Sequence, residues 1–420
     1  MRAGPASQHE TLLRRFQRDT DYAQELGVRG IRFDDVGDGS TLRVNGRVLA
    51  NFGNCSYLGL NVDPRLKAGA IEAVERFGPL YSSSIAYSAV DLYDLLTEKL
   101  QQVMGAQAVV IPPTTTLGHL AVLPSLVSGS DVILVDRHSH ASLQLTTQVL
   151  AGRGIPIQPV AHNDVPALVD AIESAEKRYE KIWYVADGLY SMYGDTAPVE
   201  TIDALMRRHP SLHVYFDDAH GFSWTGRHGR GLVLSRMPWN ERLIVAAGLA
   251  KSFGTGGAVV GFGDPKLARR VELVGGPMNF SGPIHPPTLG AMVASADIHL
   301  SDEHEILRER IDAQIDRVTT LLARHSLPAV SWARTPVWLV RVGELHHMLE
   351  VARLMLDDGY FINVSGFPVV PVGMAGIRFT QTLSNTDEQI IGMIQSLQRS
   401  LHQVVGETEA VVDLTEYHAS

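Results

Sequence analysis

The feature that most constrains this fold is an alternation of seven apolar segments with helix-like segments between residue 105 and about residue 265. The apolar segments, interpreted as strands, are residues 108–112, 131–136, 155–160, 181–186, 212–217, 243–247 and 258–263. Strands that are spaced by helices predict an α/β fold with a mostly parallel sheet and helices on both faces. Such sheets bind ligands at the carboxyl ends of their strands. Functional side chains are therefore expected just after these segments.

The length of the chain and its local breaks predict more than one domain. With 420 residues, 45% of them hydrophobic, the chain can fill one large and one smaller core. A Gly- and Pro-rich stretch at residues 276–287 interrupts the alternation. We expect an N-terminal helical arm and β-hairpin (1–50), a large domain (51–287), a small α+β C-terminal domain (288–405) and an acidic tail (406–420).

Several segments outside the sheet carry local signals of their own. Residues 8–27 have apolar side chains at roughly helical spacing, and Asn45-Gly46 between two alternating runs is typical of a hairpin turn. In the small domain we expect one long helix over about residues 288–325. Thr386-Asp-Glu-Gln389 predicts a capping box at the start of the last helix.

Charge and cysteine content limit the partners and the compartment. The net charge is −10 and no basic patch runs along the chain, which argues against nucleic acid as a partner. No apolar run approaches the roughly 20 residues of a membrane span, and the N-terminus lacks the apolar core of a signal peptide. The single cysteine, Cys55, excludes an intrachain disulfide and fits a reducing compartment. We expect a soluble cytoplasmic protein without a membrane partner.

One lysine, in Lys251-Ser-Phe-Gly254, lies between two apolar segments. Burial favours the neutral, nucleophilic form of an amine, and such an amine suits a Schiff base with a carbonyl group, above all that of pyridoxal phosphate. The alternative is a lysine that is exposed on a tight turn. The residues at the other strand ends favour the Schiff base.

The strand at residues 212–217 is followed by Asp217-Asp-Ala-His-Gly221. A buried carboxylate at a strand end needs a cationic partner, and the protonated ring nitrogen of pyridoxal phosphate would serve. Asp217 would then make the ring a better electron sink, and His220 would hydrogen-bond the phenolate oxygen of the ring. The alternatives are a metal pair, or a capping aspartate beside a surface histidine.

Two further strand ends carry polar side chains, at His138-Ser-His140 and at Asp187. An imidazole can stack on a flat aromatic ring, which makes His140 a candidate for contact with the cofactor. Two histidines at this spacing are alternatively metal ligands. No further Cys or carboxylate cluster accompanies them, so we expect no metal site.

The segment Pro112-Pro-Thr-Thr-Thr-Leu-Gly118 joins the first strand to an apolar helical stretch. Hydroxyls and backbone N–H groups at a helix start suit a phosphate, which makes Thr115 and Thr116 candidates. A helix cap made by the threonine triplet explains the segment equally well. In the small domain, Arg378 either holds a substrate carboxylate with its two-pronged guanidinium or forms a surface ion pair.

In their order and spacing these segments resemble the α-oxoamine synthases, which are pyridoxal-phosphate enzymes of the fold-type-I transferase class. The resemblance covers about residues 48–400. It rests on Tyr57-Leu-Gly-Leu60, His140-Ala-Ser142, Tyr190-Ser-Met-Tyr-Gly-Asp-Thr-Ala-Pro198, Asp217-Asp-Ala-His-Gly221, Gly226-Arg-His-Gly-Arg-Gly231, Lys251-Ser-Phe-Gly254 and Ile377-Arg378. It implies a large domain around a mostly parallel seven-stranded sheet, a small α+β C-terminal domain, and a homodimer with shared active sites.

The resemblance also implies roles for single residues. Lys251 corresponds to the Schiff-base lysine, Asp217 to the partner of the ring nitrogen, and His220 to the histidine on the phenolate side. The other implied contacts are His140 stacked on the ring, Thr115 and Thr116 at the phosphate, Ser191 and Asp187 near the cofactor, Arg378 at the substrate carboxylate, and Phe280-Ser281 at the phosphate of the neighbouring subunit.

The chain departs from the family pattern in the wall expected to face the substrate. Cys55-Ser56 replaces Asn-Asp, Tyr81-Ser-Ser-Ser-Ile-Ala-Tyr87 replaces a Gly-rich stretch, Gly248 replaces Ser or Thr, and Asp187 replaces Glu. Cys55 and Ser83 are therefore candidate substrate-binding residues. The serine-rich segment, Asp187 and Leu249-Ala-Lys-Ser-Phe253 are most similar to the aminoketone autoinducer synthases of this family, which accept S-adenosylmethionine or small amino acids with an acyl thioester.

We predict a transferase of the class I/II aminotransferase fold that uses pyridoxal phosphate in biosynthesis. It would condense an amino-acid-derived carbanion with an acyl thioester or a similar electrophile and form a carbon–carbon bond. An alternative is γ-elimination or γ-replacement on S-adenosylmethionine, with addition of the quinonoid to another partner in a specialised pathway. A third possibility is a binding or scaffold protein that has kept the fold, and the retained Lys, Asp and His set argues against it.

Overall fold

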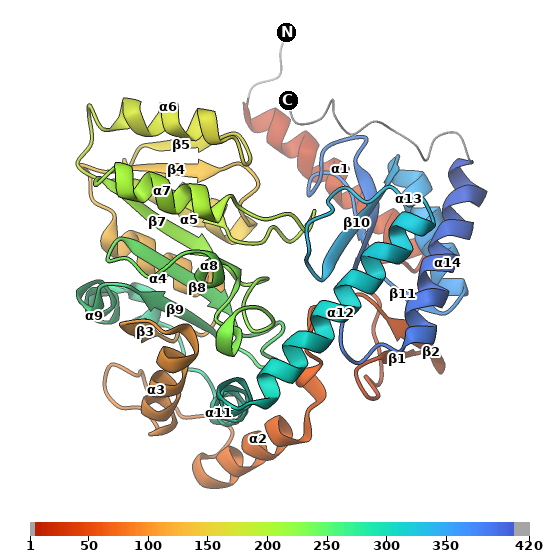
Figure 1. Cartoon of the computed structure of the whole chain (residues 1–420), viewed down its shortest axis with the longest axis horizontal. Coiled ribbons are helices and arrows are strands. Elements are labelled where there is room, and N and C mark those ends of the chain that lie inside the picture. The colour runs from red at the N-terminus through yellow and green to blue at the C-terminus, as the bar shows by residue number, and fades with distance from the viewer. Residues whose placement is uncertain (1–4, 407–420) are drawn as a thin grey trace. The chain divides into compact units, whose positions relative to one another are not determined.

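The computed structural model describes residues 5–406, which form two compact units (Figure 1). The large unit comprises Ser56–Ser191 and Asp195–Arg310. The small unit comprises the described residues up to Cys55, the short segment Met192–Gly194 and the residues from Ile311 onward. The domain boundaries proposed from the sequence stay predictions, and the predicted tail lies, from residue 407, outside the described residues.

The large unit is built on a seven-stranded sheet in the order β3-β9-β8-β7-β6-β4-β5. Its strands are β3 (Ala108–Val110), β4 (Val132–Asp136), β5 (Ile157–Val160), β6 (Ile182–Asp187), β7 (Leu212–Asp217), β8 (Leu243–Gly248) and β9 (Ala258–Phe262). Neighbouring strands in the row β8-β7-β6-β4-β5 pair in parallel, whereas β9 is antiparallel to its neighbours β8 and β3. The structure confirms the mostly parallel seven-stranded sheet, with a strand at each predicted segment.

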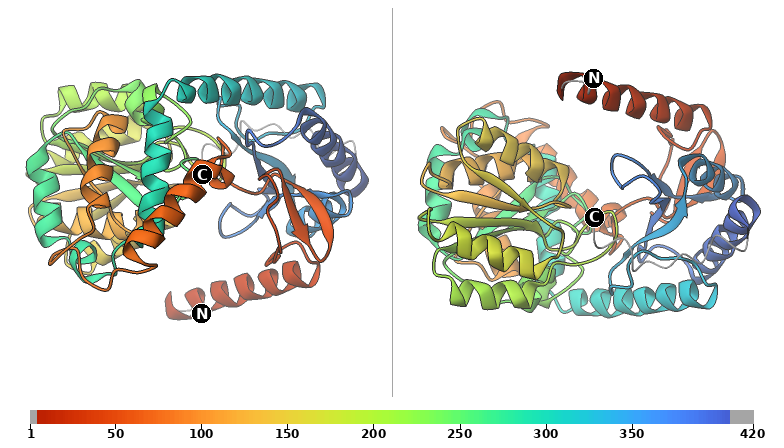
Figure 2. Two further views of the ribbon diagram at one scale, coloured as in Figure 1. Left: turned by 90° about the horizontal axis from the view of Figure 1, so that it is seen from below. Right: turned by 90° about the horizontal axis from the view of Figure 1, so that it is seen from above.

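Helices cover both faces of this sheet (Figures 1 and 2). They are α2 (Pro64–Phe77), α3 (Leu92–Met104), α4 (Thr115–Leu126), α5 (Ala141–Ala151), α6 (Val165–Ala175), α7 (Val199–Arg208), α8 (Leu232–Arg236), α9 (Pro265–Val274), α10 (Gly276–Phe280) and α11 (Pro286–Leu300), with 3₁₀ turns at Leu60–Val62 and Arg227–Gly229. Every residue of β4, β6, β8 and β9 is buried, as expected for strands that are covered on both faces.

The small unit contains two three-stranded sheets, β1-β2-β11 and β10-β13-β12. Its elements are α1 (Pro5–Glu25), β1 (Thr41–Val44), β2 (Arg47–Asn51), β10 (Val337–Gly343), α13 (Leu345–Asp357), β11 (Tyr360–Phe361), β12 (Asn363–Ser365), β13 (Ala375–Thr380) and α14 (Asp387–Val405). The predicted hairpin forms at Asn45 and Gly46, which both have positive φ angles. The predicted capping box is present, with reciprocal hydrogen bonds between Thr386 and Gln389.

One helix prediction is wrong. The single helix expected over residues 288–325 is broken into α11 and α12 (Glu303–Arg324). Ser301 ends α11 because its backbone is extended, and its hydroxyl donates to the carbonyl of Ile298 at 2.8 Å. A serine that bonds its own backbone in this way competes with the helix, and the apolar pattern on either side does not reveal it.

None of the helices within residues 5–406 combines the length and the apolar character that a membrane span requires.

Candidate active site

A pocket of about 190 Å³ lies in the large unit, where the strands of the sheet end. Its lining residues are Thr114, Thr115, Thr116, His140, Ser142, Asp187, Leu189, Asp217, Ala219, His220, Ala250, Lys251 and Gly257. Seven residues that the sequence singles out are therefore brought together: Lys251, Asp217, His220, His140, Asp187, Thr115 and Thr116. They come from separate strand ends, which explains how segments more than 100 residues apart meet at one edge of the sheet.

The start of α4 forms one wall of this pocket. The side chain of Thr114 caps the helix by accepting the Leu117 N–H at 3.2 Å. Thr115 and Thr116 are the first two residues of the helix, so their hydroxyls and the free N–H groups of the first turn lie at its positive end. The threonine triplet is thus a helix cap and also lines the pocket, and this wall suits a phosphate group.

Gly248, at the end of β8, allows Thr115 to stand where it does. A Cβ atom on Gly248 would lie only 2.9 Å from the Thr115 hydroxyl oxygen and 3.3 Å from the Ala219 Cβ. A serine or threonine at position 248 would therefore displace Thr115. Gly248 thus lacks the hydroxyl that the family pattern has at this position, and Thr115 of α4 places a hydroxyl beside it.

Lys251 follows β8 in the tight connection to the antiparallel β9. Its carbonyl accepts the Gly254 N–H at 2.9 Å, and the Leu249 N–H donates to the Gly257 carbonyl at 3.1 Å. Gly254 has φ = 81°, and a Cβ atom there would lie 2.7 Å from the Leu60 carbonyl carbon. Only glycine fits this turn without strain, and the turn fixes the partly buried lysine at the pocket.

Asp217 is a buried carboxylate that is held from two sides. Its Oδ1 accepts the Ala219 N–H at 3.0 Å, and its Oδ2 lies 2.9 Å from Nε2 of His119. Burial alone would raise the pKa of Asp217, but the hydrogen bond from His119 and the charge of Lys251 outweigh burial and lower it to about 2. Asp217 is therefore ionised at neutral pH and presents a negative charge to the pocket.

His119 is a site residue that the sequence reasoning missed. It lies on α4, is fully buried, and bonds the Tyr215 hydroxyl through Nδ1 at 2.7 Å. Its helix is apolar on all sides, so the pattern of the sequence gives no reason to separate this histidine from the core. A buried histidine in an otherwise apolar helix was the available signal, because a buried imidazole needs polar partners.

Asp187 lies beside Asp217, since the two residues are paired in the β6–β7 register. Its Oδ1 accepts the His140 N–H at 3.0 Å. Burial, together with the charge of Asp217, raises the pKa of Asp187 well above its usual value. The pKa values of the two neighbouring carboxyl groups are thus shifted in opposite directions, an arrangement that permits acid and base roles in one site.

His140 caps α5 and lines the pocket. Its Nδ1 lies 2.7 Å from the Ser142 hydroxyl, which fixes the orientation of the ring. Desolvation lowers the pKa of His140, and the charge of Lys251 adds to this. The imidazole is neutral at neutral pH and can therefore stack on a planar ligand without adding charge.

His220 is oriented by Tyr57, whose hydroxyl lies 2.6 Å from Nδ1. The backbone carbonyl of His220 accepts the indole N–H of Trp224 at 2.7 Å, which holds the turn after β7. The family segment around Tyr57 thus contributes to the site through this hydroxyl. His220 itself lines the pocket.

The remaining predicted residues do not line this pocket. Ser191 is buried at the end of a large-unit segment, the Ser83 hydroxyl donates to the Ser84 carbonyl at 3.4 Å, and the Ser281 hydroxyl donates to the Pro277 carbonyl. Arg378 and Cys55 belong to the small unit, where Nη2 of the buried Arg378 lies 4.0 Å from Sγ of Cys55. Their predicted roles stay predictions.

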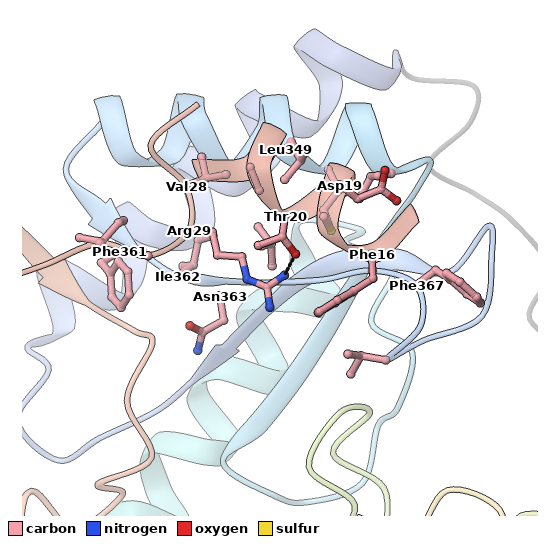
Figure 3. Close-up of a pocket in the computed structure, with 18 residues that line it drawn as sticks. Phe16, Asp19, Thr20, Val28, Arg29, Leu349, Phe361, Ile362, Asn363 and Phe367 are labelled. Atoms are coloured by element: carbon pink, nitrogen blue, oxygen red, sulfur yellow. Dashed lines mark hydrogen bonds between the residues drawn. The ribbon is translucent and has the colours of Figure 1, made fainter. Parts of the chain in front are cut away.

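A second pocket, of about 310 Å³, lies in the small unit (Figure 3). Phe16 of α1, Phe361 and Phe367 give it apolar walls, and Arg29 donates to the Thr20 hydroxyl at 3.2 Å. None of the catalytic, cofactor-binding or substrate-binding residues predicted from the sequence lines this second pocket. The pocket at the strand ends of the large unit is therefore the candidate active site.

The groups in the active-site pocket fit pyridoxal phosphate. The helix start with its two threonine hydroxyls suits a phosphate, the Lys251 amine suits an aldehyde, and the ionised Asp217 suits a protonated ring nitrogen. The described residues hold no cluster of three or more His, Cys, Asp or Glu side chains that could bind a metal ion instead.

Comparison with known proteins agrees with this fit. The profile of the family Aminotransferase class I and II matches residues 66–394. The chain is 28% identical over 402 residues to 8-amino-7-oxononanoate synthase of Azoarcus sp., covering 94% of this chain and 99% of that protein. It is 30% identical over 351 residues to the enzyme of the same name from Salmonella schwarzengrund, covering 82% of this chain and 88% of that protein.

Solved structures share the fold. A serine palmitoyltransferase variant from S. paucimobilis with a bound PLP–myriocin aldimine superimposes with a TM-score of 0.85 at 22% identity, covering 96% of this chain and 99% of that one. The family profile spans most of the chain, and the curated relatives span nearly all of it. This chain belongs to the aminotransferase class I and II family and, within it, to the pyridoxal-phosphate-dependent α-oxoamine synthases.

Proposed function

We propose that this enzyme joins the α-carbon of an amino acid to the acyl group of a thioester, with formation of a carbon–carbon bond. The observation that carries the proposal is the convergence of Lys251, Asp217 and His140 in one pocket. The names of the relatives support the same chemistry. An 8-amino-7-oxo product has its amine next to a ketone, which is the arrangement that acylation of an amino-acid α-carbon produces, and serine palmitoyltransferase is named for an acyl transfer to an amino acid.

Pyridoxal phosphate, when bound, supplies an electron sink that stabilises negative charge on the substrate α-carbon. The residues of the chain prepare this sink and move the protons. The start of α4 would hold the phosphate, Asp217 would keep a proton on the ring nitrogen by its negative charge, and His140 would stack on the ring.

Lys251 would hold the aldehyde group of the cofactor through its side-chain amine. Its Nζ would also accept and return a proton at the substrate α-carbon. Arg378 is the proposed partner of the substrate carboxylate, and Cys55 Sγ lies 4.0 Å from Nη2 of Arg378. Cys55 and Ser83 are proposed to shape selectivity for the substrate. Asp187 and Ser191 complete the proposed cofactor contacts.

We also propose a homodimer in which Phe280-Ser281 reaches the active site of the partner. Phe280 is 91% exposed and Tyr87 is 89% exposed, so both aromatic rings lie almost entirely in solvent in the single chain. The two segments are adjacent, because the Ser84 hydroxyl donates to the Asn279 carbonyl at 2.8 Å. Exposed apolar patches of this kind mark interaction surfaces. A cytoplasmic location is part of the proposal, because the single Cys55 fits a reducing compartment.

The relatives named above do not favour the alternative that starts from S-adenosylmethionine. One name describes an amino ketone product and the other describes an acyl transfer to serine. A specific measurement separates the two reactions. Release of methylthioadenosine from S-adenosylmethionine in the absence of any thioester would indicate the alternative.

The proposed reaction is tested by pairing amino acids with acyl-coenzyme A thioesters of increasing chain length. We expect one amino acid to change the absorbance of the bound cofactor, and one thioester to release free thiol and give an amino ketone detectable by mass spectrometry. The variant Lys251→Ala should lose both signals, whereas Lys266→Ala, on the exposed start of α9, should keep them. If no pair releases thiol although the cofactor is bound and responds to amino acids, the condensation is ruled out.

A further inference from the structure

We propose that His119 is a positioning residue of the cofactor site, which keeps the Asp217 carboxylate ionised and aimed at the ring nitrogen through a buried Tyr215–His119–Asp217 chain. This inference rests on the proposed binding of pyridoxal phosphate at Asp217. It does not depend on which substrates the enzyme uses.

Two short contacts link the three side chains. Burial raises the pKa of Tyr215 well above its usual value, so its hydroxyl stays protonated and can donate to Nδ1 of His119, which lies 2.7 Å away. In the tautomer that accepts this bond, Nε2 of His119 carries the proton and donates to Oδ2 of Asp217 over 2.9 Å. All three side chains are buried, with Tyr215 and His119 at 0% exposure, so water does not compete for these bonds.

Two hydrogen bonds fix the orientation of the Asp217 carboxylate. Oδ1 is occupied by the Ala219 N–H and Oδ2 by His119, so the carboxylate cannot rotate without losing a bond. Asp217 lines the pocket with its carboxylate held in this orientation. Because α4 carries both His119 and the proposed phosphate wall at Thr115, one helix sets the position of the two ends of the cofactor.

His119 also decides which of two adjacent carboxyl groups carries the charge. The charged or titratable groups around Asp217 are His119 on α4, Tyr215 on β7, Asp187 on β6, Asp218 after β7, His140 before α5 and Lys251 after β8. Of these, only His119 makes a side-chain hydrogen bond to the Asp217 carboxylate within the part of the chain that the structure describes. Without it, burial and the neighbouring carboxyl groups favour a protonated Asp217, which cannot hold a ring-nitrogen proton.

The test measures cofactor affinity, which is independent of turnover. Apoenzyme and pyridoxal phosphate are titrated by absorbance and tryptophan fluorescence between pH 5.5 and 8.5 for the wild type, His119→Leu, His119→Gln and Tyr215→Phe. We expect the Kd of His119→Leu to rise about tenfold at pH 7, which corresponds to one pKa unit at the carboxylate. The loss should grow as the pH falls, because Asp217 becomes protonated at a higher pH than in the wild type.

Two further variants test how much each hydrogen bond of His119 contributes to cofactor affinity. Gln at position 119 offers an amide N–H near the place of Nε2 and should restore part of the affinity. Tyr215→Phe removes the donor to Nδ1 and should weaken binding by a smaller factor than His119→Leu. The matched control is His299→Leu, because His299 is also fully buried in the large unit and hydrogen-bonds Ser223 at 2.8 Å, yet does not line the pocket.

Thermal unfolding of each apoprotein separates positioning from folding. We expect His119→Leu and His299→Leu to lower the melting temperature to a similar extent, with only His119→Leu changing the Kd and its pH profile. The inference is overturned if His119→Leu binds the cofactor with the wild-type Kd and pH profile. If the wild type itself binds no pyridoxal phosphate, the proposed function fails; if it binds the cofactor but condenses no substrates, only the reaction fails and the Kd series still decides the role of His119.

Discussion

Asp218 offers the sharpest prediction for stability, because it is a fully buried carboxyl group with one free oxygen. Its Oδ2 accepts the Val233 N–H at 3.0 Å, and its Oδ1 has no hydrogen-bond partner within the described chain. Gly188, Gly221 and Gly231 surround the carboxyl group so closely that a Cβ atom on any of them would collide with it. Burial, with a further contribution from the charge of Asp217, raises the pKa of Asp218 to about 8.

The sign of the pH effect follows from this shift. The folded-state pKa of about 8 lies above the usual value of 3.8, so the folded protein keeps a proton that the unfolded chain releases. The stabilisation is complete below about pH 4 and is lost as the pH rises toward 8. Between pH 5 and pH 8 the loss amounts to three units at about 1.4 kcal/mol each, or about 4 kcal/mol.

The variant Asp218→Asn removes this titration while keeping the shape of the side chain. The new amide N–H₂ group would be buried without a partner, which costs about 1–3 kcal/mol at every pH. We therefore expect Asp218→Asn to be less stable than the wild type below about pH 4 and more stable at pH 8. Between pH 5 and pH 8 the difference in stability between the two proteins should change by about 4 kcal/mol.

The assay is equilibrium urea unfolding of the apoproteins at pH 5, 6.5 and 8. Comparison within one pH is necessary because His162 titrates in an overlapping range. Burial would lower the pKa of His162, but its hydrogen bonds to Asp136 and Asp195 raise it to about 9, so the wild type also loses that stabilisation as the pH rises from 6.5 to 9. Asp170→Asn, exposed on α6, is the control. A difference between wild type and Asp218→Asn that stays constant from pH 5 to pH 8 would refute the reasoning.

Three further substitutions test the local geometry. Gly248→Thr should weaken cofactor binding, because the new Cβ atom would lie 2.9 Å from the Thr115 hydroxyl oxygen and would displace it. Adding Thr115→Ala to this variant should recover part of the affinity. Titration with pyridoxal phosphate measures both affinities. Gly254→Ala should destabilise the protein by about 1–3 kcal/mol, since φ is 81° and Cβ would meet the Leu60 backbone; a loss below 0.5 kcal/mol in urea unfolding would contradict this. Thr386→Ala should cost about 1 kcal/mol by removing the capping box, and unchanged unfolding would show that the cap contributes nothing.

The sheet could be predicted because its strands are short, apolar and separated by helices. The same regularity placed Lys251, Asp217 and His140 at strand ends, and those ends lie at one edge of a parallel sheet. The hairpin at Asn45 and the capping box at Thr386 were predictable for a different reason. Each depends on a few neighbouring residues whose backbone preferences are strong.

Features that depend on distant contacts could not be predicted in this way. His119 and Asp217 are 98 positions apart, and nothing near His119 in the sequence marks its partner. The buried state of Asp218 depends on three glycines from separate segments. The break between α11 and α12 was missed for a local reason instead. It accompanies the bond from the Ser301 hydroxyl to the Ile298 carbonyl, which the apolar pattern does not reveal.

The division of the chain into two units has a consequence for how such an enzyme diversifies. All the residues that line the pocket come from the large unit, whereas Arg378 and Cys55, which we propose for the substrate, come from the small unit. Mutations in the small unit can therefore change which amino acid substrate is accepted without altering the residues of the large unit that we propose for the cofactor. A library confined to the small unit should thus shift preference among amino acids far more often than it abolishes the yellow colour of the holoenzyme.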